Sequence, residues 1–382
     1  MNKMRIRAFV LAFLLICCVA LLAAGKYMDG QRAPESTAAE PDWTPYVEMS
    51  MNETEVSLVG GVIEEWTKWE VSAMDLAEQY RTLVNPYAAR PVTINWGIFH
   101  IPDGTFIRKQ RLEVSTDESF QNARSYELRA GERSVELRGL LVDTQYFFRI
   151  TVEMESSQGC ALEGSFTTKW SPRIMEVENL WNVRDIGGWK TLDGKAVKQG
   201  LLYRGSELDG VTDSRFQVTE FGVETMQEEL KIKTELDLRA RDLEGVQDTL
   251  GQNVEHRVIP TPLYADFFSS HSGDSVKAVF ETLAQEENYP IYLHCNYGMD
   301  RTGIICYVLE ALLGMSPEDC YRDWELSVFV YDDSNQALMD QFVAEFQEIE
   351  GQTLQEKAEN YLLSIGITQD QIDDIRSILV EQ

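Results

Sequence analysis

The segment from residue 290 to residue 314, PIYLHCNYGMDRTGIICYVLEALLG, constrains the fold more than any other part of the chain. Its apolar residues 291–293 are typical of a short buried strand, and the apolar residues after Arg301 recur at helical spacing. Cys295 therefore lies on a strand-to-helix turn. A helix start presents unpaired N–H groups and the positive end of a dipole, which together favour an anion. The expected anion is phosphate.

The turn has the form H-C-x-x-G-x-x-R-T-G, which is suited to holding and attacking a phosphate group. Its glycines let the backbone curl, so that successive N–H groups point inward and form a nest for phosphate oxygens. Arg301 has a planar fork that matches two of those oxygens. The same groups favour the thiolate form of Cys295, which is the nucleophilic form. An inert core cysteine is the alternative, and the complete pattern disfavours it.

Hydrolysis would proceed through a phosphocysteine, and the leaving oxygen would need a proton from a carboxylic acid. Asp300 lies in the turn itself, whereas Asp266 precedes the cysteine by 29 residues on a predicted loop. Both remain candidates for the acid. Thr302 can donate a hydrogen bond to the departing sulfur, and His294 is expected to organise the loop rather than to act as a base. This chemistry requires neither a metal nor a cofactor.

The first 25 residues predict a segment for export. Lys3, Arg5 and Arg7 precede an unbroken apolar run from residue 8 to residue 24. The run is either a signal peptide, because small residues follow for cleavage, or a membrane anchor, because it is long enough to span a bilayer. Residues 26–48 are polar and predict a linker. The expected location is secreted or membrane-anchored, with the rest of the chain outside the cytoplasm.

A net charge of −29 argues against a nucleic-acid partner, since the sequence contains no basic stripe. Contact with a membrane is expected through the N-terminal segment only. Outside that segment the chain has four cysteines, which are too sparse for a disulfide scaffold. They are Cys160, Cys295, Cys306 and Cys320.

A length of 382 residues predicts two domains after this extension. From residue 91 short stretches of alternating apolar residues predict strands, and their spacing indicates a β-sandwich. Residues 49–85 are ambiguous between strand and helix. After residue 172 strands alternate with helices, which predicts a mainly parallel sheet covered on both faces. We therefore predict a small all-β sandwich over residues 49–170 and an α/β domain over residues 171–382.

The run LRGLLVDTQYFFRITV, followed by SFTT, resembles a fibronectin type III domain over about residues 86–170. Tyr146 matches the corner tyrosine of that family, and Trp96 matches a core tryptophan. The resemblance implies a scaffold, or a module that binds a surface partner.

The stretch HCNYGMDRTG resembles the phosphate-binding loop of cysteine-dependent protein tyrosine phosphatases, particularly the bacterial tyrosine/serine and lipid phosphatases. The segments NVRDIGGWKTLDGKAVKQGLLYRGSEL, TELDLRARDLE and YRDWELS are similar to other parts of that family. The resemblance runs from about residue 179 to the end, and it implies Cys295 as nucleophile, Arg301 as phosphate ligand and Asp300 as acid. Arg184 and Asp185 would lie near the pocket or make buried structural contacts. The residues implied around the phosphate are Asn296, Tyr297, Gly298, Met299, Thr302 and Gly303.

One residue departs from the family pattern, because members with lipid activity usually have lysine where this chain has Met299. Without that cation at the lip of the pocket, phosphotyrosine or a small phosphomonoester is favoured over a phosphoinositide. The chain is therefore expected to be an exported phosphatase of tyrosine or dual specificity. Two alternatives stay open: an inositol-phosphate or phosphoinositide phosphatase with the same loop, and a surface binding module with little or no turnover.

Overall fold

The computed structural model describes residues 46–50, 54–68, 72–80, 89–101, 103–155, 159–239, 248–269, 271–331 and 335–382. The predicted export segment, residues 1–25, lies outside these ranges, as does most of the predicted linker. Among the described residues, none of the helices combines the length and the apolar character needed to cross a membrane.

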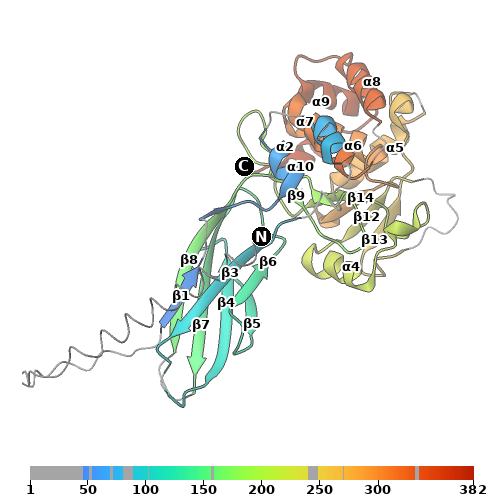
Figure 1. Cartoon of the computed structure of the whole chain (residues 1–382). Helices are drawn as coiled ribbons and strands as arrows, with labels where there is room; N and C mark the ends of the chain where they lie inside the picture. Colours follow the sequence, from blue (N-terminus) through green and yellow to red (C-terminus); the bar gives the residue numbers. More distant parts are fainter. Residues whose placement is uncertain are drawn as a thin grey trace, which may run out of the picture. The chain divides into compact units, whose positions relative to one another are not determined.

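The first part of the described chain forms two β-sheets (Figure 1). One sheet has the strand order β1-β3-β6, and the other has the order β2-β8-β7-β4-β5. β2 pairs with β8 in parallel, and the other neighbours are antiparallel. Alternating apolar residues predicted most of these strands, because every second side chain of a strand faces the core. The strands are β1 (Tyr46–Ser50), β2 (Glu55–Val56), β3 (Val92–Phe99), β4 (Ile107–Ser115), β5 (Arg124–Leu128), β6 (Ser134–Leu137), β7 (Gln145–Met154) and β8 (Cys160–Thr168).

The two sheets share one hydrophobic core, and we call this part the sandwich. Trp96 is buried in that core, and its indole N–H donates to Gln110 Oε1 at 3.1 Å. The buried Tyr146 hydroxyl accepts the N–H of Leu141 at 2.7 Å, which ties the start of β7 to the preceding backbone. These contacts agree with the roles expected for both aromatic residues. The resemblance to a fibronectin type III domain itself stays a prediction.

The second part of the chain is built on a six-stranded sheet with the order β13-β12-β14-β11-β10-β9. The first four strands are parallel, and β10 and β9 extend one edge in antiparallel orientation. Strands β12, β14 and β11 are buried along their whole length, as central strands of a covered parallel sheet are. The predicted α/β fold is confirmed. The strands are β9 (Arg173–Ile174), β10 (Arg184–Asp185), β11 (Leu202–Gly205), β12 (Thr234–Asp237), β13 (Glu255–Val258) and β14 (Ile291–His294).

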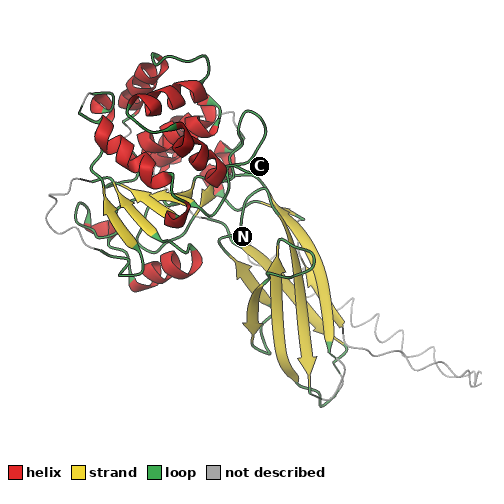
Figure 2. Ribbon diagram, turned by 180° about the vertical axis from the view of Figure 1, so that it is seen from behind, coloured by secondary structure: helices red, strands yellow, loops and turns green. Residues whose placement is uncertain are grey.

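Helices cover both faces of this sheet (Figures 1 and 2). α4 lies on one side, and the helices that follow β13 lie on the other (Figure 1). Successive residues of β14 therefore enter different cores: Ile291 and Leu293 pack in one, and Tyr292 packs in the other. The helices are α4 (Glu220–Glu224), α5 (Gly273–Leu283), α6 (Arg301–Leu313), α7 (Pro317–Glu325), α8 (Gln336–Gln347), α9 (Leu354–Ser364) and α10 (Gln369–Leu379).

Two helices that precede most of the sandwich in sequence belong to the core of the α/β part. α2 (Gly61–Trp66) contributes Val62, Ile63 and Trp66 to the cluster that also holds the apolar residues of α6, and α3 (Ala73–Tyr80) contributes Ala73 and Leu76. This segment was predicted to belong to the sandwich, over residues 49–170, and its packing shows that this prediction is wrong. The physical reason is that the sandwich closes its core with its own strands, so the apolar face of α2 needs another partner.

The contacts of Trp66 show how this segment is held. Its indole N–H donates to Glu325 Oε2 at 3.3 Å, and the Arg322 guanidinium lies 3.9 Å from the centre of its ring. Glu325 Oε1 accepts the N–H of Ala73 at 3.0 Å. α7 therefore binds both N-terminal helices through side chains that are three residues apart, on one face of the helix.

Replacing Trp66 by alanine is expected to lower the free energy of unfolding by about 3–5 kcal/mol, because it removes a fully buried indole and leaves a cavity. Urea denaturation followed by circular dichroism measures the change. Leu192→Ala is the control, since Leu192 is 71% exposed and should change stability by less than about 0.5 kcal/mol. Equal stability of the two variants would show that α2 does not stabilise the α/β part.

Candidate active site

The turn that carries Cys295 connects β14 to α6. Cys295 is 3% exposed, and Asp300 occupies the N-cap position of α6, which begins at Arg301. Gly298 has a φ of +68°, and a Cβ atom there would lie 2.2 Å from the carbonyl oxygen of Gly205. Both the backbone angle and the contact require glycine at this position. The strand, turn and helix predicted around Cys295 are thus confirmed.

Three backbone carbonyl oxygens of the turn accept hydrogen bonds from residues outside the turn. The donors are Glu207 N to Asn296 O at 3.0 Å, Asn182 Nδ2 to Tyr297 O at 3.2 Å, and Arg204 Nη2 to Gly298 O at 2.8 Å. Because a trans peptide places its C=O and N–H on opposite sides, the N–H groups of these peptides face the other way. Within the described residues, no N–H from Asn296 to Arg301 donates a hydrogen bond. The turn therefore presents a set of unpaired donors, as an anion-binding nest does.

Arg301 stands at the start of α6 with its charge available. Its Nη1 donates to the carbonyl oxygen of Leu238 at 3.3 Å, and no carboxylate of the described part of the chain forms an ion pair with it. The hydroxyl of Thr302 is buried and has no hydrogen-bond partner in the described structure. It is free to donate to a ligand, and its expected hydrogen bond to the departing sulfur stays a prediction.

The two candidate acids differ in position. Asp300 Oδ1 accepts hydrogen bonds from the Tyr264 hydroxyl at 2.8 Å and from Asn335 Nδ2 at 2.6 Å. Burial raises the pKa of Tyr264 well above its usual value, and the nearby Asp300 charge adds to this. The Tyr264 hydroxyl therefore stays protonated and keeps donating. Asp266 is exposed at the end of the short helix Tyr264–Asp266, and within the described part of the chain its carboxylate makes no hydrogen bond or ion pair with the turn.

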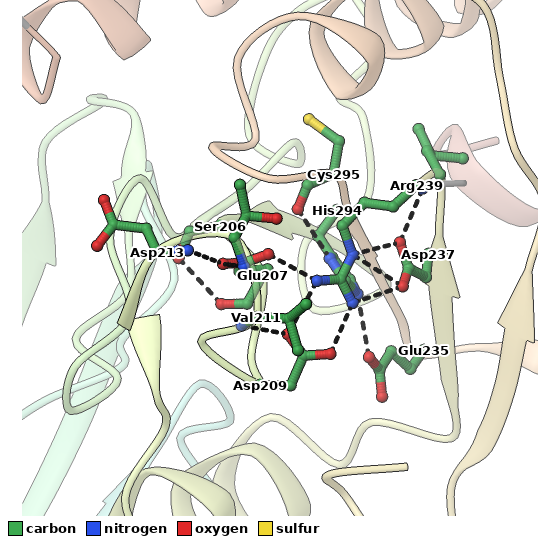
Figure 3. A network of polar contacts seen from close by, with 12 residues as sticks. Ser206, Glu207, Asp209, Val211, Asp213, Glu235, Asp237, Arg239, His294 and Cys295 are labelled. Carbon is green, nitrogen blue, oxygen red and sulfur yellow. Dashed lines mark hydrogen bonds and ion pairs between the residues drawn. The ribbon is translucent and has the colours of Figure 1, made fainter. Parts of the chain in front are cut away.

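Behind the turn lies a buried network of charged residues (Figure 3). His294 Nδ1 lies 3.0 Å from the carbonyl oxygen of Cys295, and its Nε2 lies 3.0 Å from Glu235 Oε1. Both partners are acceptors, so the ring must carry a proton on each nitrogen to satisfy them. Burial alone would lower the pKa of His294, but Asp237 and Glu235 outweigh it and raise the pKa to about 9. His294 thus organises the turn as a cation.

Arg239 connects this network to the other side of the turn (Figure 3). Its guanidinium binds the carboxylates of Asp237 at 2.7 Å, Asp209 at 2.8 Å and Glu207 at 2.6 Å. Burial would raise the pKa of Asp237, but His294, the nearby His256 ring 3.8 Å away and the hydrogen bonds from Arg239 hold it well below its usual range. Glu207 also supplies the N–H that holds the turn at Asn296. The network therefore fixes the turn through two hydrogen bonds to its backbone, from His294 to Cys295 O and from Glu207 N to Asn296 O.

Stability is expected to fall as the pH rises through about 9, because His294 then loses its charge. An unfolded histidine has a pKa near 6.5, so the charge stabilises the fold fully below that value and is lost above the folded pKa. The contribution is on the order of 3 kcal/mol. Urea unfolding of the wild type and of His294→Asn, each near pH 6 and near pH 10, measures this contribution. The free energy of unfolding should fall between the two pH values by more in the wild type than in the variant. A variant with the wild-type pH dependence would contradict this assignment.

Arg184 and Asp185 are buried and make several polar contacts. Arg184 Nε donates to Asp323 Oδ1 at 2.9 Å, and Asp323 Oδ2 also accepts from Arg204 Nη1 at 2.5 Å. Asp185 accepts from Arg173 Nη1 at 2.5 Å, away from the turn. Arg184 Nη1 also donates to Asn182 Oδ1 at 2.6 Å. Arg184 therefore acts on the turn through its partners, namely Asp323 with Arg204 on one side and Asn182, which binds Tyr297 O, on the other.

Met299 is the residue expected at the lip of the pocket, in place of a lysine. Its side chain is 2% exposed and packs in the hydrophobic cluster with α6. Sequence reasoning missed Asn182, Arg204 and Asp323 as supports of the turn. Arg204 offered a signal, because a charged residue inside a short apolar strand must find a buried partner.

The model of the tyrosine phosphatase family matches residues 175–381. The chain belongs to this family. It is a cysteine-dependent phosphatase, and the match spans the α/β part that carries the turn. No match was found among curated proteins.

Two of the solved structures that are similar to this phosphatase share 17% of its residues in the aligned part. One is the catalytic domain of the PP-IP phosphatase Siw14 from S. cerevisiae, with 17% identity over 42% of this chain and 89% of that chain, and a TM-score of 0.30. The other is TpbA of P. aeruginosa in complex with phosphotyrosine, with 17% identity over 46% of this chain and 91% of that chain, and a TM-score of 0.30. Similarities this distant do not identify a substrate.

Proposed function

We propose that this phosphatase hydrolyses phosphotyrosine in proteins through a phosphocysteine intermediate on Cys295. The observation that carries the proposal is the set of unpaired N–H groups between Asn296 and Arg301, next to an arginine without a carboxylate partner in the described structure. These donors suit the oxygens of a phosphate dianion. Their position at the start of α6 would place the phosphorus near the sulfur.

The proposed reaction has two steps. In the first, the Cys295 thiolate attacks phosphorus, the bond to the substrate oxygen breaks, and that oxygen takes a proton from Asp300. In the second, a water molecule gives its proton to Asp300 and attacks the phosphocysteine, which releases inorganic phosphate and restores the thiolate. The amides and Arg301 hold the equatorial oxygens in both steps, where charge accumulates.

A rapid-quench experiment with a phosphotyrosine peptide tests the proposal. We expect a covalent phosphate adduct on the peptide that contains Cys295, found by mass spectrometry. Phosphoserine peptide, phosphoinositide and inositol hexakisphosphate are compared as substrates under the same conditions. Turnover without any adduct on Cys295 would reject the intermediate, and a preference for inositol hexakisphosphate would reject the proposed substrate class.

Asp300→Asn is expected to lower kcat for a phosphotyrosine peptide by ~10²–10⁴-fold, because the leaving phenolate loses its proton donor. The loss should be much smaller with a nitrophenyl phosphate, whose leaving group needs less protonation. Asp266→Asn is the matched control, and we expect it to change kcat by less than about twofold. If Asp266→Asn shows the large loss of kcat and Asp300→Asn shows almost none, Asp266 is the acid.

We also propose that the chain is exported, with the sandwich as a fibronectin type III-like module over about residues 86–170. The support for export is the basic and apolar order of residues 1–25, and the support for the module is the corner contact of Tyr146. Protease accessibility of the phosphatase in intact cells, compared with lysed cells, tests its location. Protection in intact cells would reject export.

A further inference from the structure

A cavity of about 1480 Å³ lies beside the turn. Tyr297, Met299 and Asp300 of the turn line one side of it, and Arg124 and Tyr126 of β5 line the other. Pockets that take small ligands usually measure roughly 300–1,000 Å³. The cavity is therefore larger than a small phosphomonoester needs.

The two walls belong to one compact unit, residues 45–382. Gln199 exchanges two hydrogen bonds with the backbone of Val142, from Val142 N at 2.8 Å and to Val142 O at 3.0 Å. The Arg173 guanidinium donates to the carbonyl oxygens of Leu140 at 3.0 Å and Gly139 at 2.8 Å. Buried contacts thus connect the sandwich to the phosphatase part next to the cavity.

The wall near the turn is aromatic, and we define the aromatic wall as Trp181, Tyr297 and Tyr331. The rings of Tyr297 and Tyr331 are 5.1 Å apart, and those of Trp181 and Tyr331 are 6.4 Å apart. Arg215 lies 5.1 Å from the centre of the Trp181 ring, with its charge paired to Asp213. Such a surface suits apolar and aromatic side chains beside the phosphate, and it suits a dense polyanion poorly.

The opposite wall carries unpaired cations. Arg90 and Arg124 line the cavity, and neither forms an ion pair with a carboxylate of the described residues. Arg124 lies 5.2 Å from the centre of the Tyr126 ring and donates to the carbonyl oxygen of Arg138 at 3.5 Å. Four of the carboxylates that line the cavity have partners: Glu136 and Glu176 pair with Arg138, Glu178 accepts a hydrogen bond from Thr219, and Asp300 accepts from Tyr264 and Asn335. Glu229 also lines the cavity and has no such partner among the described residues.

We infer that this cavity binds a segment of polypeptide substrate, with the sandwich as its second wall. The inference rests on the proposed function and names its substrate class. The phosphorylated residue reaches the turn, neighbouring apolar side chains pack on the aromatic wall, and carboxylates of the substrate pair with Arg124 and Arg90. In a chain with a net charge of −29, these arginines form a local site for an acidic segment.

Arg124→Ala tests the sandwich wall. The readout is the ratio of kcat/KM for an acidic phosphotyrosine peptide to kcat/KM for a nitrophenyl phosphate. We expect the ratio to fall about tenfold, through KM of the peptide, because one charge-assisted contact is lost. Arg149→Ala is the matched control: Arg149 is also a sandwich arginine stacked on an aromatic ring, 4.2 Å from the centre of Phe120, but it does not line the cavity.

The outcomes separate the inference from the proposed function. An unchanged ratio in Arg124→Ala, or an equal fall in Arg149→Ala, overturns the inference while the phosphatase remains active. A wild type that prefers the nitrophenyl phosphate to the peptide overturns it as well. Absence of turnover with both substrates contradicts the proposed function instead. A fall of the ratio confined to Arg124→Ala, and reduced at high salt, supports the inference.

Discussion

Cys295→Ser is expected to lower kcat by at least ~10⁴-fold, because a serine hydroxyl at this place remains protonated and cannot attack phosphorus. The N–H groups of the turn and Arg301 remain, so binding of the substrate should survive. Steady-state hydrolysis of a phosphotyrosine peptide measures the loss, and isothermal titration with the same peptide measures binding.

The control for this substitution is Cys160→Ser. Cys160 is a half-buried thiol of β8, outside the α/β part, and its replacement should leave kcat unchanged. A Cys295→Ser variant that keeps a tenth or more of the activity would show that Cys295 is not the nucleophile. Loss of both turnover and binding would point instead to a collapsed turn.

Arg301→Lys is expected to lower kcat/KM by ~10²–10³-fold even though the positive charge is kept. The planar guanidinium can hold two phosphate oxygens at once, whereas an ammonium group is a single point of charge. The loss should appear in kcat as well as in KM, because the contact strengthens as charge accumulates in the transition state.

Arg257→Lys is the matched control for Arg301. Arg257 belongs to the same α/β part and pairs with Glu255 at 2.7 Å, on β13, so its replacement should change kcat/KM by less than about twofold. Equal activity of Arg301→Lys and the wild type would mean that charge alone suffices and that the bidentate contact is absent. Vanadate affinity of both variants, measured in parallel, separates a binding defect from a slower chemical step.

The local chemistry of the site could be predicted from a short stretch of sequence. The strand, the turn with its positive-φ Gly298, and the helix that starts at Arg301 follow from neighbouring residues, since backbone angles and helix starts are local properties. The choice between Asp300 and Asp266 could not be made in this way. The contacts that hold Asp300 come from Tyr264 and Asn335, which are 36 and 35 residues from it in sequence.

By itself the sequence determined that a cysteine, a ring of backbone donors and an arginine would meet at the start of one helix. Only the tertiary structure decided what holds that ring open. Asn182 and Arg204 donate hydrogen bonds to turn residues that are 115 and 94 positions away in sequence. Trp66 donates to Glu325, which is 259 positions away. Such contacts depend on how whole elements pack, and no local pattern of residue types encodes which distant side chain will be the partner.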